Sequence, residues 1–171
     1  MKIICFPHFY YLSEVSRLVE IGKALRILGQ DVLFFSHGGS YEHVAQEADF
    51  EGRVLLAPHV PAHRVNSLAD IAITHGGAGT VQPAIHAGTP LVGIPMHLEQ
   101  TGNLSLVTRQ GAGLMLSKWD LNRRSLGRAL ERLLTDVSLR ENMLRLKALQ
   151  DKVDGPANAA GEIVKFLGAS A

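Results

Sequence analysis

A glycine-rich segment with a histidine in front of it is the part of the sequence best suited to chemistry. The segment is His75-Gly76-Gly77-Ala78-Gly79-Thr80, and it follows the apolar run Ile71 to Thr74. Glycines let a phosphate approach the backbone, and the amides of a following helix point at it with a dipole worth ~0.3–1 kcal/mol. His75 adds a ring N–H donor and Thr80 a hydroxyl donor. The segment is a candidate phosphate site, although a tight turn with close helix packing explains the glycines equally well.

The same glycines do not reproduce the fingerprint of dinucleotide-binding enzymes. The run Gly77 to Gln82 lacks the third glycine of that fingerprint, and it follows an inner strand instead of the first one. A dinucleotide oxidoreductase is therefore the least supported of the functions considered. We expect no nicotinamide or flavin cofactor.

The pair Glu99-Gln100 is the second candidate site. It comes shortly after a turn, strand and turn formed by Ala87 to Pro95, so we expect it at the same carboxyl edge of the sheet as the glycines. A carboxylate and an amide offer the acceptors and the donor that neighbouring hydroxyls of a sugar require. The alternative is that Glu99 only favours the N-terminus of its own helix.

Short apolar runs that alternate with helical stretches must position these residues. Such alternation predicts an α/β fold with a doubly wound, mostly parallel sheet of six strands in the order 3-2-1-4-5-6. The expected strands are Lys2 to Phe6, Asp31 to Ser36, Arg53 to Leu56, Ile71 to Thr74, Leu91 to Ile94 and Gly113 to Leu116. The expected helices are Val15 to Leu28, Tyr41 to Ala48, Gly79 to His86, Glu99 to Gln110, Asn122 to Leu134, Ser138 to Lys152 and Pro156 to Phe166.

Composition limits the classes of protein that the chain could belong to. Its 171 residues, 46% of them hydrophobic, fit a single domain. Seventeen Lys and Arg against sixteen Asp and Glu, without dense basic runs, argue against a nucleic-acid partner. The one cysteine, Cys5, cannot form an internal disulfide, so we expect a cytoplasmic setting. No stretch approaches the ~18 apolar residues of a membrane-spanning helix.

Two histidines, His59 and His63, have a spacing that could suggest a metal pair. Pro61 lies between them, and no cysteine or carboxylate cluster completes a ligand set. We therefore expect no metal.

Taken together, the motifs resemble the donor-site signature of GT-B glycosyltransferases of the UDP-glycosyltransferase and macrolide glycosyltransferase type. The resemblance rests on Asp70 to Thr80, Ala87 to Pro95, Glu99-Gln100 and Asn103. It implies that His75 and the segment Gly76-Gly77-Ala78-Gly79-Thr80 hold the nucleotide diphosphate, and that Glu99 and Gln100 hold the transferred sugar. It also implies that no metal is needed, because the helix N-terminus takes its place.

The resemblance covers two separated pieces of the family's chain. Residues 51–171 resemble the end of the donor-binding domain, and residues 1–50 resemble the start of the acceptor-binding domain. The pieces join near Phe50-Glu51, where an apparent helix end passes almost directly into a strand. We therefore expect a single hybrid domain over residues 1–171, shortened relative to the family and lacking the middle of a full-length enzyme.

Several positions depart from the family pattern. Where the family carries a histidine as general base, this chain has Glu14, which makes Glu14 the first candidate for the catalytic base and His8, after the first strand, the second. The alternatives are a helix-terminal glutamate and a hydrogen-bonded loop histidine, neither with a chemical role. Pro83 replaces an acid for the ribose hydroxyls, and Ala62 replaces a glutamine that contacts the nucleobase.

The resemblance implies transfer of a sugar from a nucleotide-diphosphate sugar, most simply a UDP-sugar, to a hydroxyl of a small molecule or lipid. A base would take the acceptor proton while His75 and the helix amides stabilise the departing diphosphate. The alternatives are a non-catalytic nucleotide-sugar-binding module and one subunit of a split transferase, with a homodimer or a partner subunit completing the cleft. We expect the chain alone to bind better than it transfers, because positioning the acceptor contributes roughly 7–11 kcal/mol to catalysis.

Overall fold

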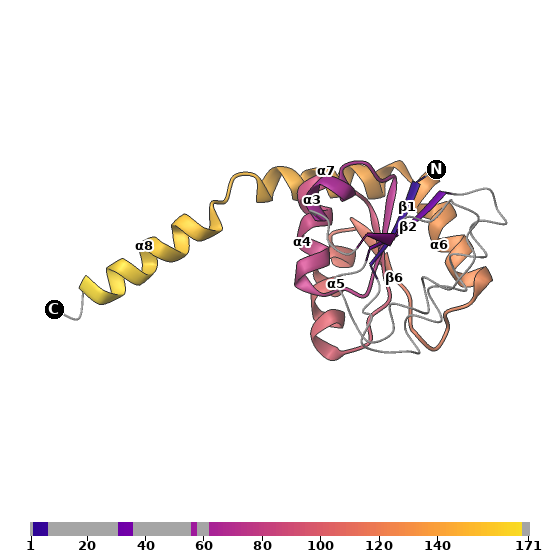
Figure 1. The fold of residues 1–171 in the computed structure, drawn as a ribbon, viewed down its shortest axis with the longest axis horizontal. Helices are drawn as coiled ribbons and strands as arrows, with labels where there is room; N and C mark the ends of the chain where they lie inside the picture. Colours follow the sequence, from indigo (N-terminus) through magenta and orange to yellow (C-terminus); the bar gives the residue numbers. More distant parts are fainter. Residues whose placement is uncertain (1, 7–30, 36–55, 58–61, 169–171) are drawn as a thin grey trace.

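The computed structural model of the chain describes residues 2–6, 31–35, 56–57 and 62–168 (Figure 1). The expected helices Val15 to Leu28 and Tyr41 to Ala48 lie outside the described residues, as does most of the expected strand Arg53 to Leu56. Both candidate bases, Glu14 and His8, also lie outside them.

A parallel β-sheet forms the centre of the described structure (Figure 1). In sheet order its strands are β3 (Leu56–Ala57), β2 (Asp31–Phe35), β1 (Lys2–Phe6), β4 (Ile71–Thr74), β5 (Leu91–Gly93) and β6 (Gly113–Met115). Every neighbouring pair runs parallel. The α/β class expected from the sequence is confirmed.

Continuous apolar runs make β4 and β5 strands that are buried on both faces. All four residues of β4 and all three of β5 are buried, with Ile71 and Leu91 at 0% exposure. A parallel sheet that is covered by helices on both faces requires such runs instead of an alternating pattern. In the view of Figure 1, α4 and α6 flank the sheet on opposite sides.

The helices largely follow the predicted pattern, with ends that differ by one or two residues. They are α3 (Ala62–Asn66), α4 (Ala78–Ala87), α5 (Leu98–Arg109), α6 (Arg123–Thr135), α7 (Val137–Gln150) and α8 (Gly155–Gly168). The sequence did not predict α3, because five residues are too few to show a helical period. The buried Asn66 at its end donates from Nδ2 to the carbonyl of Ala62 at 2.7 Å.

The core behind the candidate site is built around Leu104 of α5. This side chain is completely buried and packs in a cluster with Ala72, Val81, Ala84, Leu91, Val107, Ala112 and Met143. A Cβ atom at Gly93 of β5 would lie only 2.2 Å from Leu104 Cδ2. The glycine therefore lets α5 approach the end of the sheet closely.

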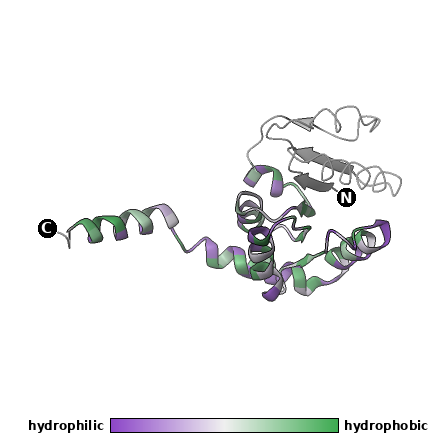
Figure 2. Cartoon of the chain, turned by 90° about the horizontal axis from the view of Figure 1, so that it is seen from below, coloured by the Kyte–Doolittle hydropathy of each residue, from purple (hydrophilic) through white to green (hydrophobic). Residues whose placement is uncertain are grey.

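The last helix, α8, extends away from the rest of the molecule (Figure 1). Its side chains are exposed along its length, and Figure 2 shows that many of them are hydrophobic. In the part of the chain that the structure describes, no helix combines the length and the apolar character needed to cross a membrane.

Candidate functional site

The glycine-rich segment forms the turn between β4 and α4, and Gly76 is the residue that shapes it. Its φ angle is +94°, and a Cβ atom there would lie 2.5 Å from Leu104 Cδ1. Its amide donates a hydrogen bond to Thr74 Oγ1 at 3.0 Å. Both the backbone conformation and the space exclude a side chain, so this glycine has a structural role.

Gly77 makes room for the imidazole of His75. A Cβ atom at Gly77 would lie 2.6 Å from His75 Nε2, which places the half-buried ring directly against the turn. The turn and the ring therefore form one surface in front of α4. The phosphate contacts expected for His75 and this turn stay a prediction.

The N-terminus of α4 lacks a side-chain cap. Its N-cap residue is Gly77, which has φ −63° and ψ 147° and no side chain that could accept a hydrogen bond. The amides of Thr80 and Val81 bond to the Gly77 carbonyl at 2.9 and 3.0 Å. Within the described residues, no acceptor is paired with the amides of Ala78 and Gly79, and such amides at a helix start favour an anion.

Gly79 adds open space to this surface. A Cβ atom there would meet nothing within 4 Å. The same is true of Gly102 in α5 and Gly127 in α6, so open space alone does not mark a site. What distinguishes Gly79 is its place in the first turn of α4, where the unpaired amides lie.

The hydroxyl of Thr80 is engaged within the turn. Its Oγ1 donates to the Gly77 carbonyl at 2.9 Å and lies 2.5 Å from Thr74 Oγ1. Thr74 Oγ1 in turn accepts from the amide of Gly76. The two hydroxyls thus connect both ends of the turn, and donation from Thr80 to a phosphate, which stays a prediction, requires its hydroxyl to change partners.

The side chain of Gln100 supports the start of α5. It is 7% exposed, and its Oε1 accepts from the amides of Met96 at 2.7 Å and His97 at 3.3 Å. The carbonyl end is therefore committed to the backbone. The expected contact of Gln100 with a sugar must therefore be made by its side-chain amide nitrogen.

Asn103 connects the two candidate sites. Its Nδ2 donates to the carbonyl of Gly76 at 3.0 Å and to Glu99 Oε1 at 2.6 Å. The exposed carboxylate of Glu99 is thereby held at a fixed position relative to the glycine turn. Sequence reasoning placed Asn103 in the signature without a role, and its spacing of four residues from Glu99 was the available signal.

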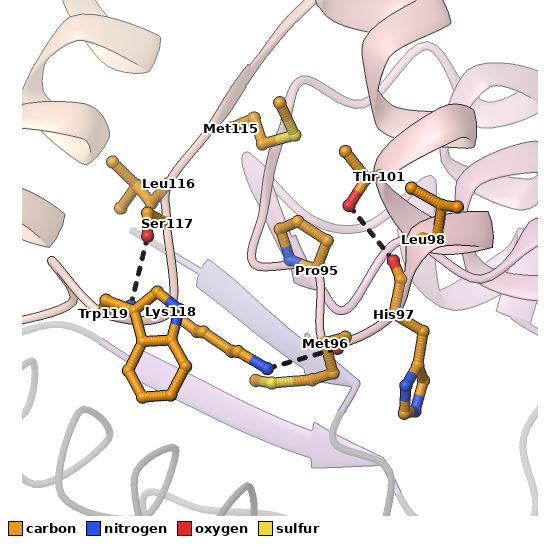
Figure 3. A pocket seen from close by; sticks show the side chains of 10 residues that line it. All are labelled: Pro95, Met96, His97, Leu98, Thr101, Met115, Leu116, Ser117, Lys118 and Trp119. Carbon is orange, nitrogen blue, oxygen red and sulfur yellow. Dashed lines mark hydrogen bonds between the residues drawn. The ribbon is translucent and has the colours of Figure 1, made fainter.

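A pocket of about 430 Å³ lies beyond the carboxyl ends of β5 and β6, and the sequence analysis missed it (Figure 3). Its lining residues are Pro95, Met96, His97, Leu98, Thr101, Met115, Leu116, Ser117, Lys118 and Trp119. Lys118 Nζ donates to the carbonyl of Met96 at 3.3 Å and lies 5.0 Å from the centre of the Trp119 ring. The tryptophan Trp119, three residues after the expected strand Gly113 to Leu116, was the signal that could have revealed it.

Two of the positions that depart from the family pattern, Ala62 and Pro83, lie on α3 and α4. Ala62 begins α3, and Pro83 lies inside α4 beside an open pocket of about 400 Å³. The described residues contain no cluster of three or more His, Cys, Asp or Glu side chains. His59, the suggested metal partner of His63, lies outside them.

Comparison with known proteins identifies the family. The chain matches the family model described as "UDP-glucoronosyl and UDP-glucosyl transferase" over residues 12–166. It is 36% identical to UDP-glucuronosyltransferase 2B7 of Homo sapiens over 96 residues, which are 56% of this chain and 18% of that protein.

Solved glycosyltransferases share the fold. CalG4, the calicheamicin glycosyltransferase, matches 98% of this chain with a TM-score of 0.83 and 26% identity, and the match covers 42% of CalG4. The glycosyltransferase VinC in complex with DTDP matches 96% of this chain with a TM-score of 0.76 and 23% identity, over 41% of VinC.

The chain thus spans less than half the length of these solved relatives and about a fifth of the human enzyme. The family model nevertheless covers most of the chain, and the GT-B resemblance expected from its glycine turn is confirmed. The chain belongs to the family of UDP-glucoronosyl and UDP-glucosyl transferases.

Proposed function

We propose that the chain binds a nucleoside-diphosphate sugar with its diphosphate at the N-terminus of α4. The observation that carries the proposal is the uncapped start of this helix at Gly77, against which the ring of His75 lies. Two backbone donors, a ring nitrogen and the positive end of a helix together suit a dianionic diphosphate. The carboxyl edge of a parallel sheet is also where such folds bind ligands.

In this proposal the sugar lies between the glycine turn and the start of α5. Glu99 offers a carboxylate held by Asn103, and Gln100 offers its amide nitrogen. Because Asn103 also bonds to Gly76, movement of the turn and movement of Glu99 are coupled. This coupling holds the donors for the diphosphate and the acceptors for the sugar hydroxyls in a constant position relative to each other.

Sugar transfer then follows direct displacement at the anomeric carbon. A base takes the proton of the acceptor hydroxyl as its oxygen attacks, and the bond to the diphosphate breaks on the opposite side. His75 and the α4 amides stabilise the charge that develops on the leaving diphosphate. Glu14, with His8 as the second candidate, is the proposed base.

The nucleobase stays open between uracil and thymine in this proposal. VinC, which shares the fold, is a complex with DTDP, whereas the family description names UDP. Ala62 and Pro83 cannot supply the amide and carboxylate that the family pattern places there. Both nucleoside diphosphates therefore belong in the binding experiment.

We extend the proposal to the organisation of the chain. A single hybrid domain of six strands, with residues 1–50 from an acceptor-type half and 51–171 from a donor-type half, is supported by the pairing of β1 with β4. A homodimer or partner subunit that completes the acceptor side, and a cytoplasmic location, remain predictions from the sequence.

A pair of substitutions at Gly79 tests the diphosphate site by charge alone. A Cβ atom at Gly79 would meet no atom within 4 Å, so the position has room for aspartate or asparagine. An acidic residue in the first turn also stabilises a helix by ~0.3–1 kcal/mol. Gly79→Asp should nevertheless weaken UDP and TDP binding about tenfold or more in calorimetric titrations, because the carboxylate repels the diphosphate. The isosteric Gly79→Asn should stay within about threefold of the unsubstituted chain.

Equal affinities for the two variants would contradict the proposal. Thermal unfolding of both variants shows in the same preparations that the fold is retained. Binding of UDP without hydrolysis or transfer of a UDP-sugar would restrict the proposal to a binding module.

A further inference from the structure

The helix α8 exposes apolar side chains along its whole length. Ile163 is 60%, Val164 68% and Leu167 63% exposed, and in both views the helix extends away from the sheet (Figure 1, Figure 2). A helix of 14 residues that contains three glycines is marginally stable in water without packing. Its apolar side therefore indicates a surface that packs against another segment.

The polar side of α8 has no net charge to offer a partner. Lys165 Nζ donates to Glu162 Oε1 at 2.7 Å within the helix, and Asn158 is the other polar side chain of this side. A partner that is recognised by charge, such as a nucleic acid, meets no cluster of like charges on this helix. Apolar packing is the interaction that remains.

Four apolar residues of α8 recur at the spacing of a helix–helix seam. They are Ala157, Ala160, Val164 and Leu167, with intervals of three, four and three residues. The pattern is symmetric about Glu162, because Ala157 and Leu167 each lie five positions from it and Ala160 and Val164 each lie two. On one side of this centre the residues are small, and on the other side they are large.

This pattern is complementary to a reversed copy of itself. When two copies of α8 run antiparallel around a two-fold axis level with Glu162, Ala157 faces Leu167 of the second copy and Ala160 faces its Val164. Each small residue then lies opposite a large one, which lets the two helices interdigitate. A parallel pair would place alanine opposite alanine and leucine opposite leucine.

We infer that α8 pairs with α8 of a second copy of this chain, in an antiparallel seam made by Ala157, Ala160, Val164 and Leu167. The inference goes beyond the proposed function, because it involves no residue of the diphosphate site. Two helices of 14 residues are each about 21 Å long and bury less than the ~1,200–2,000 Å² of stable interfaces. The expected dimer therefore dissociates with a constant of about 10–100 µM.

Sedimentation equilibrium of the full chain tests the dimer. Between about 5 µM and about 500 µM the mean mass should rise from that of the monomer toward twice that value. Leu167→Ala should weaken dimerisation about tenfold or more, because the dimer loses this side chain twice. The matched control is Leu106→Ala, which removes a 67% exposed leucine from α5 and should leave the dissociation constant unchanged.

Exchanging two facing residues tests the register. Ala160→Val crowds the seam and Val164→Ala opens a gap in it, so each should weaken dimerisation about threefold or more. The double variant Ala160→Val/Val164→Ala has the composition of the unsubstituted chain and again sets valine opposite alanine. Its dissociation constant should return to within about threefold of the original. Unspecific association of apolar helices predicts the opposite for Ala160→Val, which adds apolar surface.

A chain that stays monomeric at about 500 µM, or a dimer that Leu167→Ala leaves unchanged, would overturn the inference. A double variant that is weaker than both single variants would overturn the antiparallel register. Cosedimentation with phosphatidylcholine vesicles, without dimers in their absence, would overturn it in favour of a lipid surface. UDP titrations of the same variants should show unchanged affinity, so the diphosphate site and the dimer are tested separately.

Discussion

The helices α4 and α6 differ in whether side chains accept hydrogen bonds from the first backbone amides at their N-termini. At α6, Asn122 Oδ1 accepts from the amides of Arg124 and Ser125, both at 3.0 Å, and Ser125 Oγ accepts from the amide of Asn122. At α4, the corresponding position is Gly77, which has no side chain to offer. Side chains near the start of α6 therefore satisfy its first amides, whereas the N-cap of α4 makes no side-chain hydrogen bond.

The contrast extends to the other long helices. Side chains accept hydrogen bonds from first-turn amides at the starts of α6, α7 and α8, whereas the N-cap of α4 makes no such bond. These acceptors are Asn122, Asp136 and Asp154. A cap contributes about 1 kcal/mol, and its absence at the carboxyl edge of the sheet is the difference on which the proposed diphosphate site at α4 rests.

The largest effect expected from this comparison is on ligand binding at α4. His75→Ala should weaken UDP binding by about 1.5–3 kcal/mol, or about 10- to 150-fold, because it removes a hydrogen bond to a charged group. The control is His86→Ala, at the last turn of the same helix, where the exposed histidine lies 3.4 Å from Asp151. Calorimetric titrations should show no change for His86→Ala, and equal losses for both variants would contradict the assignment.

A smaller effect, on stability, is expected at α6. Asn122→Ala leaves two amides without an acceptor and should lower the free energy of unfolding by about 1 kcal/mol in urea titrations. Asn122→Gly should cost only a few tenths of a kcal/mol, because glycine is tolerated at an N-cap. Neither change should alter UDP affinity. A loss of UDP binding in either variant would show that the two helix starts are not functionally distinct.

The sequence predicted the fold better than it predicted contacts. Apolar runs and breakers located β4 and the long helices α4 to α7 within one or two residues, because each has a clear period or a buried run. The helix α3 was not predicted, because its five residues are too few to show a helical period. The position of the glycine turn was predicted correctly, since its glycines and its place after a strand are local features.

The roles of the individual residues within the candidate site could not be predicted from the sequence. Gly76 is required because Leu104, 28 residues later, fills the space of its Cβ atom, and only the packed structure shows this. Similarly, the hydroxyl of Thr80 is engaged by Thr74, and the carbonyl of Gln100 by backbone amides. Residues of the right type were identified, but their partners depend on tertiary packing.

The smallest effect is a pH dependence that should separate α7 from α6. Asp136 is the N-cap of α7, and its carboxylate accepts from the amide and the hydroxyl of Ser138. The hydrogen bond from the Ser138 side chain, with the bond from its amide and the nearby Arg132, lowers the pKa of Asp136 from its ordinary value of 3.8. The N-cap of α6 is the side-chain carboxamide of Asn122, which does not titrate.

Because the folded pKa of Asp136 lies below its unfolded value, its contribution to stability is present above pH 3.8 and is lost as the pH falls through the folded pKa. Urea unfolding between about pH 5 and about pH 2 should therefore show a shallower loss for Asp136→Asn than for the unsubstituted chain. Asp151, whose pKa is lowered chiefly by a hydrogen bond from Lys147, contributes in the same window. The contribution of Asp151 is measured by the same unfolding series on Asp151→Asn. If stability falls with pH equally in Asp136→Asn and in the unsubstituted chain, the α7 cap is no more sensitive to acid than the neutral cap of α6.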